Sequence, residues 1–170
     1  ELRFVSEPMP LVNLFRTGKP SPRLERLRNL SLFVNLRPAE LRIVDGLLHE
    51  RDYLEGEVIF DEGDEGQAIY IVASGEVLIC RPRQGDVRRL AQLGPGTFFG
   101  ELALLDDSPR SAQARAASAC QLIVFFRDDF VGLLDTHARI ASKILRELAR
   151  HLGARMRAMA QAAGADQQLL

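Results

Sequence analysis

Between Tyr53 and Phe126 the sequence alternates short apolar runs with glycine-containing turns. The runs VIF, AIYIVASGEVLIC, RRLAQLG and CQLIVF are rich in branched apolar residues, and EGDEG, SG, RQGD and GPG interrupt them. Short strands at this spacing are typical of an all-β sandwich or barrel. Most of the glycines, such as Gly56 and Gly96, fall at the breaks, where a turn needs a positive φ angle. The segment 53–126 therefore predicts a small β-sheet domain.

Helical spacing precedes this β-segment. Residues 23–49 carry leucines at mostly helical intervals, and Pro38 stands where a first helical turn tolerates it. Two short helices are expected there. Residues 1–22 hold several prolines around the apolar piece LVNLF, which predicts an extended N-terminal arm with one short helix.

Helical spacing also follows the β-segment. Within 127–162 we expect a short helix capped by Asp128 or Asp129, and then a longer helix from about His137. The longer helix carries an apolar stripe that includes Ala141, Leu145, Leu148, Leu152 and Met159. The stripe predicts packing on the β-domain, on a twin helix, or on both. Residues 163–170 form a tail.

The composition limits the class of protein. With 170 residues, 46% of them hydrophobic and 26% charged, the chain has the size of one folded domain with a few added helices. A formal net charge of −1 gives no overall attraction to DNA, RNA or acidic lipid. No apolar run in the given residues approaches the ~18 residues of a membrane helix, and we expect neither a membrane helix nor a secretory signal. Cys80 and Cys120 lie in apolar runs, which predicts buried, reduced thiols of a cytoplasmic protein.

One loop, FGELALLDDSPRSA at residues 99–112, has the pattern of a small anion site. The run ELALL predicts one or two helical turns whose first N–H groups can bind a phosphate, and Gly100 lets a ligand approach the backbone. The planar fork of Arg110 suits two phosphate oxygens, whereas Glu101 suits a hydroxyl such as a ribose 2′-OH. A sugar phosphate fits this pair. From the chemistry alone, a Glu101–Arg110 salt bridge that closes a surface turn fits equally well.

The longer stretch FGELALLDDSPRSAQARAASAC resembles the phosphate-binding cassette of the cyclic nucleotide-binding domain family, which includes transcription regulators, kinase regulatory subunits and gated ion channels. GEVIFDEGDEGQAIYIVASGEVLI is similar to the family's early strands, and LFVNLRPAELRIV is similar to its first helices. The resemblance covers about residues 30–160. It implies an α+β fold in which an eight-stranded antiparallel β-roll, or jelly-roll, is flanked by N-terminal helices and a long C-terminal helix. The whole cyclic nucleotide-binding domain would span 23–162.

The resemblance also implies a role for each cassette residue. Gly100 and Glu101 would hold the ribose, with Glu101 on the 2′-OH, and Arg110 would pair with the cyclic phosphate. Further donors to the phosphate would be the backbone N–H groups of Leu102, Ser111 and Ala112, together with the Ser111 hydroxyl. The cavity would be lined by Phe99, Leu102 and a strand residue such as Ile71 or Val72.

The last helix would cover the base. When that helix is aligned on LARHL, its lid positions fall near Arg155 and Met156, with Arg155 over the purine face and Met156 in apolar contact. A solvated helix arginine is the alternative for Arg155. In this family, selection of cyclic GMP often accompanies a threonine after the cassette arginine. Ser111 stands there in this chain, so cyclic AMP is the predicted ligand and cyclic GMP the less favoured one.

The resemblance implies a sensor or regulatory module that signals by movement of its C-terminal helix and forms a homodimer through that helix. No enzyme is predicted, because His49, His137 and His151 are too scattered for a metal site and no nucleophile–base pair stands out. Two rival functions are a fragment of a DNA-binding regulator, although no recognition helix follows the long helix here, and a dimerisation scaffold that binds no nucleotide. We expect this chain to contact no nucleic acid and to contain no membrane segment.

Overall fold

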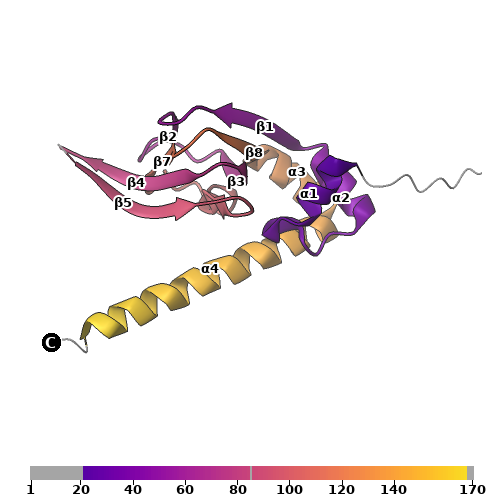
Figure 1. Ribbon diagram of the computed structural model, residues 1–170. Coiled ribbons are helices and arrows are strands. Elements are labelled where there is room, and N and C mark those ends of the chain that lie inside the picture. Colours follow the sequence, from indigo (N-terminus) through magenta and orange to yellow (C-terminus); the bar gives the residue numbers. More distant parts are fainter. Residues whose placement is uncertain (1–20, 85, 168–170) are drawn as a thin grey trace, which may run out of the picture.

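The structure is a computed structural model that describes residues 21–84 and 86–167. Figure 1 shows two β-sheets beside a group of helices, with the long helix α4 running past the sheets. In spatial order, the first sheet contains β1 (Leu48–Tyr53), β8 (Cys120–Phe126), β3 (Ala68–Ser74) and β6 (Phe98–Phe99). The second contains β2 (Val58–Phe60), β7 (Gln113–Ala116), β4 (Val77–Arg83) and β5 (Asp86–Leu93). All neighbouring strands pair antiparallel, which confirms the predicted α+β fold with its eight-stranded antiparallel β-roll.

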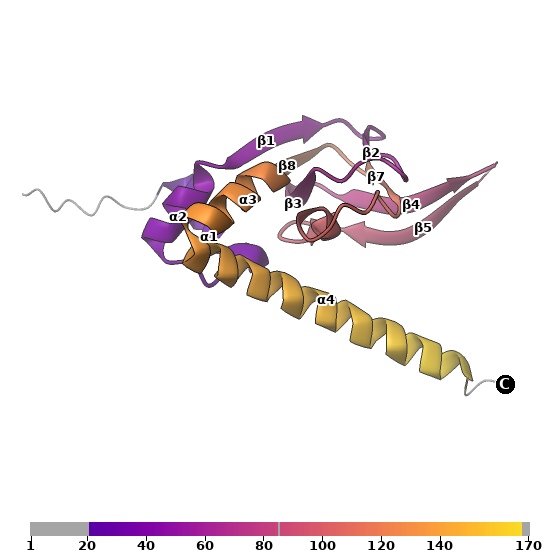
Figure 2. The same ribbon diagram turned by 180° about the vertical axis from the view of Figure 1, so that it is seen from behind.

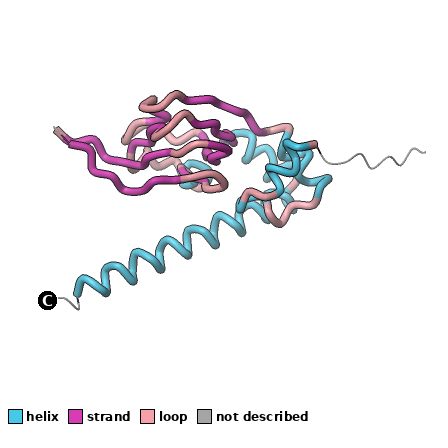
Figure 3. Tube along the Cα trace, in the orientation of Figure 1, coloured by secondary structure: helices cyan, strands magenta, loops and turns pink. Residues whose placement is uncertain are grey.

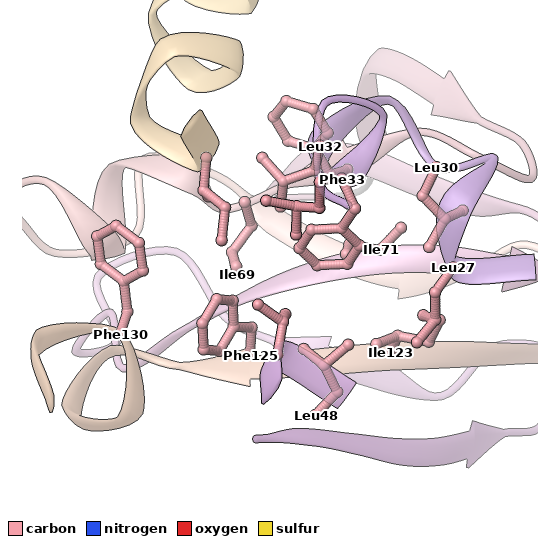
Figure 4. Close-up of a cluster of buried hydrophobic side chains, with 14 of the residues drawn as sticks. Leu27, Leu30, Leu32, Phe33, Leu48, Ile69, Ile71, Ile123, Phe125 and Phe130 are labelled. Carbon is pink, nitrogen blue, oxygen red and sulfur yellow. The ribbon is translucent and has the colours of Figure 1, made fainter. Parts of the chain in front are cut away.

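Strands β3 and β8 form the centre of the fold because both of their faces are buried. Between the two sheets lies one apolar cluster, which contains Val72, Val77, Phe99, Ala114 and Leu122. The other face of the first sheet meets the helices in a second cluster (Figure 4), which includes Leu27, Leu30, Phe33, Ile69, Ile71, Ile123, Phe125 and Phe130. Burial on both faces explains why AIYIV and LIVF read as continuous apolar runs instead of alternating ones.

In the described part of the chain, five helical segments flank the first sheet. They are α1 (Pro22–Arg28), the 3₁₀ helix η1 (Ser31–Phe33), α2 (Pro38–Asp45), α3 (Arg127–Thr136) and α4 (Ala138–Gln167). Pro22 and Pro38 stand in the first turns of α1 and α2, where the N–H that proline lacks has no partner within the helix. The Leu24 N–H donates to the Ser21 hydroxyl at 3.3 Å, which caps α1.

Strand β1 begins at Leu48, inside the range 23–49 that we predicted to be helical. Its six residues LHERDY contain four polar or charged side chains, and only Leu48 is buried. Among the described strands it lies at the edge of the first sheet and pairs only with β8. An edge strand that faces solvent needs no apolar alternation, so this stretch has no period that distinguishes it from the end of a helix.

The predicted cap of α3 is also wrong. Strand β8 leads directly into α3, and Phe126 takes the N-cap position with an extended backbone and no side-chain hydrogen bond. Asp128 and Asp129 lie in the first turn instead. Carboxylates there interact favourably with the positive end of the helix dipole without acting as caps.

Within the described residues, the buried apolar side chains of helix α4 all lie in its first half. Ile140, Ile144 and Leu148 are buried on one face, at intervals of four residues. All residues from Ala154 to Gly164 are exposed, and Figures 1 and 2 show this half of α4 extending beneath β5 and beyond the helices. The helix continues without a break to Gln167 (Figure 3), so residues 163–167, which we predicted to belong to a tail, are helical instead. Within the described ranges, no helix combines the length and the apolar character that crossing a membrane requires.

An ion pair ties α2 to α4 and makes stability depend on pH. Lys143 Nζ lies 2.6 Å from Glu40 Oε2, and the Arg37 N–H donates to the same oxygen at 2.8 Å. The Arg37 hydrogen bond, followed by the contact with Lys143, lowers the pKa of Glu40 below its ordinary value of 4.5. A carboxyl group with a lowered folded pKa adds stability above its unfolded pKa and loses that contribution as the pH falls through the folded value.

We therefore expect Glu40→Gln to unfold more easily than the wild type at pH 7, and the difference to shrink as the pH falls below about 4.5. Urea unfolding followed at a series of pH values measures both effects. Parallel pH profiles for the two proteins would contradict this role of Glu40.

Candidate functional site

A cavity of about 650 Å³ opens between the β-roll and α4. One wall is the cassette, which comprises β6, the short 3₁₀ helix η2 (Glu101–Leu104) and the loop up to Ala112. The second wall comes from the β4–β5 hairpin, through Ile79, Arg81, Leu90, Ala91 and Leu93. The third comes from α4, through His151, Arg155 and Met159. Three segments that are distant in the sequence thus enclose one space.

Gly100 begins η2 with a backbone that only glycine adopts easily. Its φ angle is +72°, in the left-handed region. A Cβ atom at this position would come within 2.5 Å of Arg110 Nη1. We predicted that Gly100 would leave room for a ligand. The structure adds a further reason for glycine, since the missing side chain is what allows the arginine to lie against the cassette backbone.

Arg110 is a buried cation, with only 7% of its surface exposed. Its Nη1 donates to the Gly100 carbonyl at 3.1 Å and its Nη2 to the Ala68 carbonyl at 2.8 Å, while Nε is buried and has no hydrogen-bond partner among the residues that the structure describes. In the described part of the chain no carboxylate forms an ion pair with it. Burial lowers the pKa of Arg110 from its ordinary value, but an arginine remains charged at neutral pH. A buried positive charge without a counterion marks a place where an anion is stabilised.

Glu101 is also buried, with 3% of its surface exposed, but its partner is not Arg110. Its Oε1 pairs with Nη1 of Arg155, so the ion pair joins the start of η2 to α4 across the cavity. The alternative of a Glu101–Arg110 salt bridge closing a surface turn is therefore wrong. Glu101 and Arg110 therefore do not neutralise each other, and the charge of Arg110 is available to another partner.

The other predicted site residues fall into two sets. Residues that line the cavity are Phe99, Leu102, Ser111, Ala112 and Arg155. Met156 does not line it: the side chain is 70% exposed and points elsewhere, whereas Met159, four residues after Arg155, lies in the wall. At 3.6 residues per turn, residues four apart share a face and adjacent residues do not. Ile71 and Val72 are wholly buried in the two apolar clusters instead of lining the cavity.

Several lining residues were missed by the sequence analysis. His151 and Met159 lie four residues before and after Arg155, so the helical period applied to Arg155 would have found both. Arg81 and Leu90 come from the β4–β5 hairpin. No local signal identifies them, because their place in the wall depends on how the two sheets fold over each other.

Comparison with known proteins agrees with this geometry. The family described as cyclic nucleotide-binding domain matches residues 50–137. A cyclic AMP receptor protein from Thermus thermophilus is 40% identical over 127 residues, which are 74% of this chain and 59% of that relative. The curated relatives that it matches are longer proteins, and this chain spans less than two thirds of their length.

Solved structures give the same result. The N-terminal domain of a transcriptional regulator from Streptomyces coelicolor has a TM-score of 0.68 at 30% identity, covering 79% of this chain and 94% of that one. The regulatory domain of Toxoplasma gondii PKA, crystallised with cyclic AMP, has a TM-score of 0.59 at 35% identity, covering 68% of this chain and 46% of that one. The family match spans more than half of the chain and coincides with the β-roll and its cassette. The chain therefore belongs to the cyclic nucleotide-binding domain family.

Proposed function

We propose that this chain is a cyclic AMP-binding regulatory module of the cytoplasm and not an enzyme. The observation that carries the proposal is the buried Arg110, which faces a cavity of about 650 Å³ without a carboxylate partner in the described residues. A cyclic phosphate offers such a guanidinium a compact anion with two free oxygens. The names of the relatives support cyclic AMP, since one is a cyclic AMP receptor protein and another was crystallised with cyclic AMP. The free thiols of Cys80 and Cys120 support a reducing compartment.

In this proposal each part of the cassette has one task. Arg110 binds the cyclic phosphate with the N–H groups that its two backbone carbonyl partners leave free. Glu101 accepts a hydrogen bond from the ribose 2′-OH through Oε2, the oxygen that Arg155 does not use. Further phosphate donors are the backbone N–H groups of Leu102, Ser111 and Ala112, with the Ser111 hydroxyl. Gly100 and Phe99 shape the cavity around the sugar.

The walls beyond the cassette contain the polar side chains Arg81, His151 and Arg155, and also an apolar part that favours adenine over guanine. Leu90, Ala91 and Met159 offer no hydrogen-bonding side chain there. Guanine carries more polar groups on its edge than adenine, and polar groups moved from water to an apolar wall lose free energy. Ser111 stands where cyclic GMP binders of the family often have threonine. Cyclic AMP is therefore the proposed ligand, and cyclic GMP a weaker one.

The signal would leave through α4. The Glu101–Arg155 ion pair connects the cassette to this helix, so a nucleotide that engages Glu101 and draws in η2 changes a contact on which the position of α4 depends. The hinge would lie in α3, around Phe130 to Leu134. A ligand shifts such an equilibrium only by its difference in affinity for the two helix positions.

Calorimetric titration with cyclic AMP and cyclic GMP tests the proposed function. The protein is first unfolded and refolded to remove any nucleotide that was purified with it. Binding at micromolar or lower concentration, tighter for cyclic AMP, is expected. No heat and no thermal shift at millimolar nucleotide would overturn the proposal. Methyl spectra of Leu145 and Leu152 that do not change with bound nucleotide would overturn the movement of α4.

We also propose that the exposed half of α4 pairs with a second copy of this chain. Six apolar residues along α4, three before the exposed half and three within it, follow alternating intervals of four and three, and we call them the α4 seam: Leu145, Ala149, Leu152, Met156, Met159 and Ala163. This spacing is that of a coiled coil. The distal part of the seam is exposed, and a long helical segment without packing partners is only marginally stable in water. Together these observations support a homodimer through α4.

We expect Met156→Glu to convert the dimer into a monomer without unfolding it. The side chain is 70% exposed in the single chain, so the fold does not depend on it, whereas in the dimer two carboxylates would face each other in an apolar contact. Light scattering after size-exclusion chromatography measures the mass. Ala154→Glu adds the same charge on the opposite side of α4 and is expected to leave the dimer intact. A wild-type monomer, or equal effects of both variants, would contradict pairing through the seam.

A further inference from the structure

The guanidinium of Arg110 lies on an aromatic ring that the sequence did not single out. Its Cζ is 4.1 Å from the centroid of Phe60 and 5.7 Å from that of Tyr70. Phe60, Tyr70 and Phe99 form a cluster with centroids 5.4 to 5.9 Å apart. The three rings come from β2, β3 and β6, and thus from both sheets. The arginine is held over the place where the two sheets meet inside the roll.

These contacts hold in place a buried cation that has no counterion among the described residues. The carbonyls of Gly100 and Ala68 fix two nitrogens at the edge of the guanidinium, and Nε has no partner in the described part of the chain. Phe60 covers the flat face at cation–π distance. An attraction of this kind grows when water is excluded, as it is around Arg110.

An aromatic partner differs from a carboxylate in a way that matters for binding. A carboxylate would neutralise the guanidinium and occupy its N–H donors, so an incoming phosphate would have to compete with it. A ring face uses none of these donors and leaves the positive charge in place. The guanidinium can therefore be oriented before the ligand arrives, which reduces the ordering cost of binding.

From these contacts we infer that Phe60 is a positioning residue for anion binding. It acts through Arg110 by holding the guanidinium in the plane from which the unused N–H groups reach the phosphate. The inference rests on the proposed function, in which that anion is the cyclic phosphate of the nucleotide.

The first test compares leucine and tyrosine at position 60. Phe60→Leu keeps an apolar side chain but removes the ring, and is expected to weaken cyclic AMP binding about tenfold to thirtyfold. Phe60→Tyr keeps the ring face and is expected to bind within about threefold of the wild type. Phe126→Leu is the matched control, because Phe126 packs against His49 outside the cavity and should leave the affinity unchanged. Equal affinities for Phe60→Leu and the wild type would overturn the inference.

A double-mutant cycle with Arg110→Ala separates positioning from direct contact, since Phe60 itself borders the cavity. If Phe60 acts through Arg110, Phe60→Leu changes little in the Arg110→Ala background, and NMR titration at millimolar nucleotide can measure such weak binding. A loss of affinity that persists in this background would mean that the ring touches the nucleotide, and would overturn the positioning role.

A third test measures the chemical shift of an Arg110 proton in the free wild-type protein and therefore needs no nucleotide. In the free wild-type protein, the ring current of Phe60 should shift the Nε–H proton of Arg110 upfield, and Phe60→Leu should remove that shift. An unshifted proton in the wild type would overturn the inference. Failure of the proposed function looks different, because the shifted proton would then be present although no cyclic nucleotide binds.

Discussion

We expect Arg110→Ala to lower the affinity for cyclic AMP by about 2–5 kcal/mol, which corresponds to roughly thirtyfold to several thousandfold in Kd. The guanidinium is the buried cation of the cavity, and its removal leaves the cyclic phosphate in a water-poor space without a charged partner. The fold should survive, because the side chain forms no ion pair in the described residues and its main structural contacts are two carbonyls and the rings of Phe60 and Tyr70. Calorimetry gives the affinity, and thermal unfolding checks the fold.

Arg115→Ala is the matched control for this experiment. Arg115 lies five residues later on β7 and also has a buried Nε without a partner, but it does not line the cavity. Its replacement should leave the affinity unchanged. If Arg110→Ala binds cyclic AMP as well as the wild type does, the site assignment fails. A β-roll retained for dimerisation would then be the better account of the chain.

The sequence predicted best those features in which neighbouring residues act together. Gly100, Glu101 and Arg110 are close in the chain, and all three meet within one cassette. The β-roll could also be predicted from the sequence, because β3 and β8 are buried on both faces and their apolar runs are continuous. Strand β1 was missed for the opposite reason: it lies at a sheet edge, and its side chains are mostly exposed.

The partners of the cassette residues could not be predicted in the same way. The loop pattern left a Glu101–Arg110 salt bridge open, whereas Glu101 pairs with Arg155, which lies 54 residues later on α4. The ring beneath Arg110 is that of Phe60 on β2, in the second sheet, whereas β6 of the cassette belongs to the first sheet. Both contacts depend on the path of the chain through the β-roll. A sequence without structure shows which groups need partners, but only the topology decides which partners reach them.

We expect Gly100→Ala to weaken cyclic AMP binding at least tenfold, although the change adds a single methyl group. The backbone φ of +72° is unfavourable for alanine by roughly 1–2 kcal/mol. More importantly, the new Cβ would lie 2.5 Å from Arg110 Nη1, so the guanidinium or η2 must move. Either movement breaks the hydrogen bond from Nη1 to the Gly100 carbonyl and takes the cation out of the plane set by Phe60. The affinity loss should therefore approach that of deleting the arginine.

Gly56→Ala separates the effect of backbone strain from the effect of the close contact with Arg110. Gly56 has a φ of +85° in the turn before β2, and a Cβ there would meet nothing within 4 Å. The variant carries the same kind of backbone strain without a contact to Arg110, so it should lose stability in thermal unfolding and keep its affinity for cyclic AMP. Gly100→Ala should lose both. If the two variants bind equally well, the close approach of Arg110 to the cassette backbone does not control binding, and the glycine is required only for its turn.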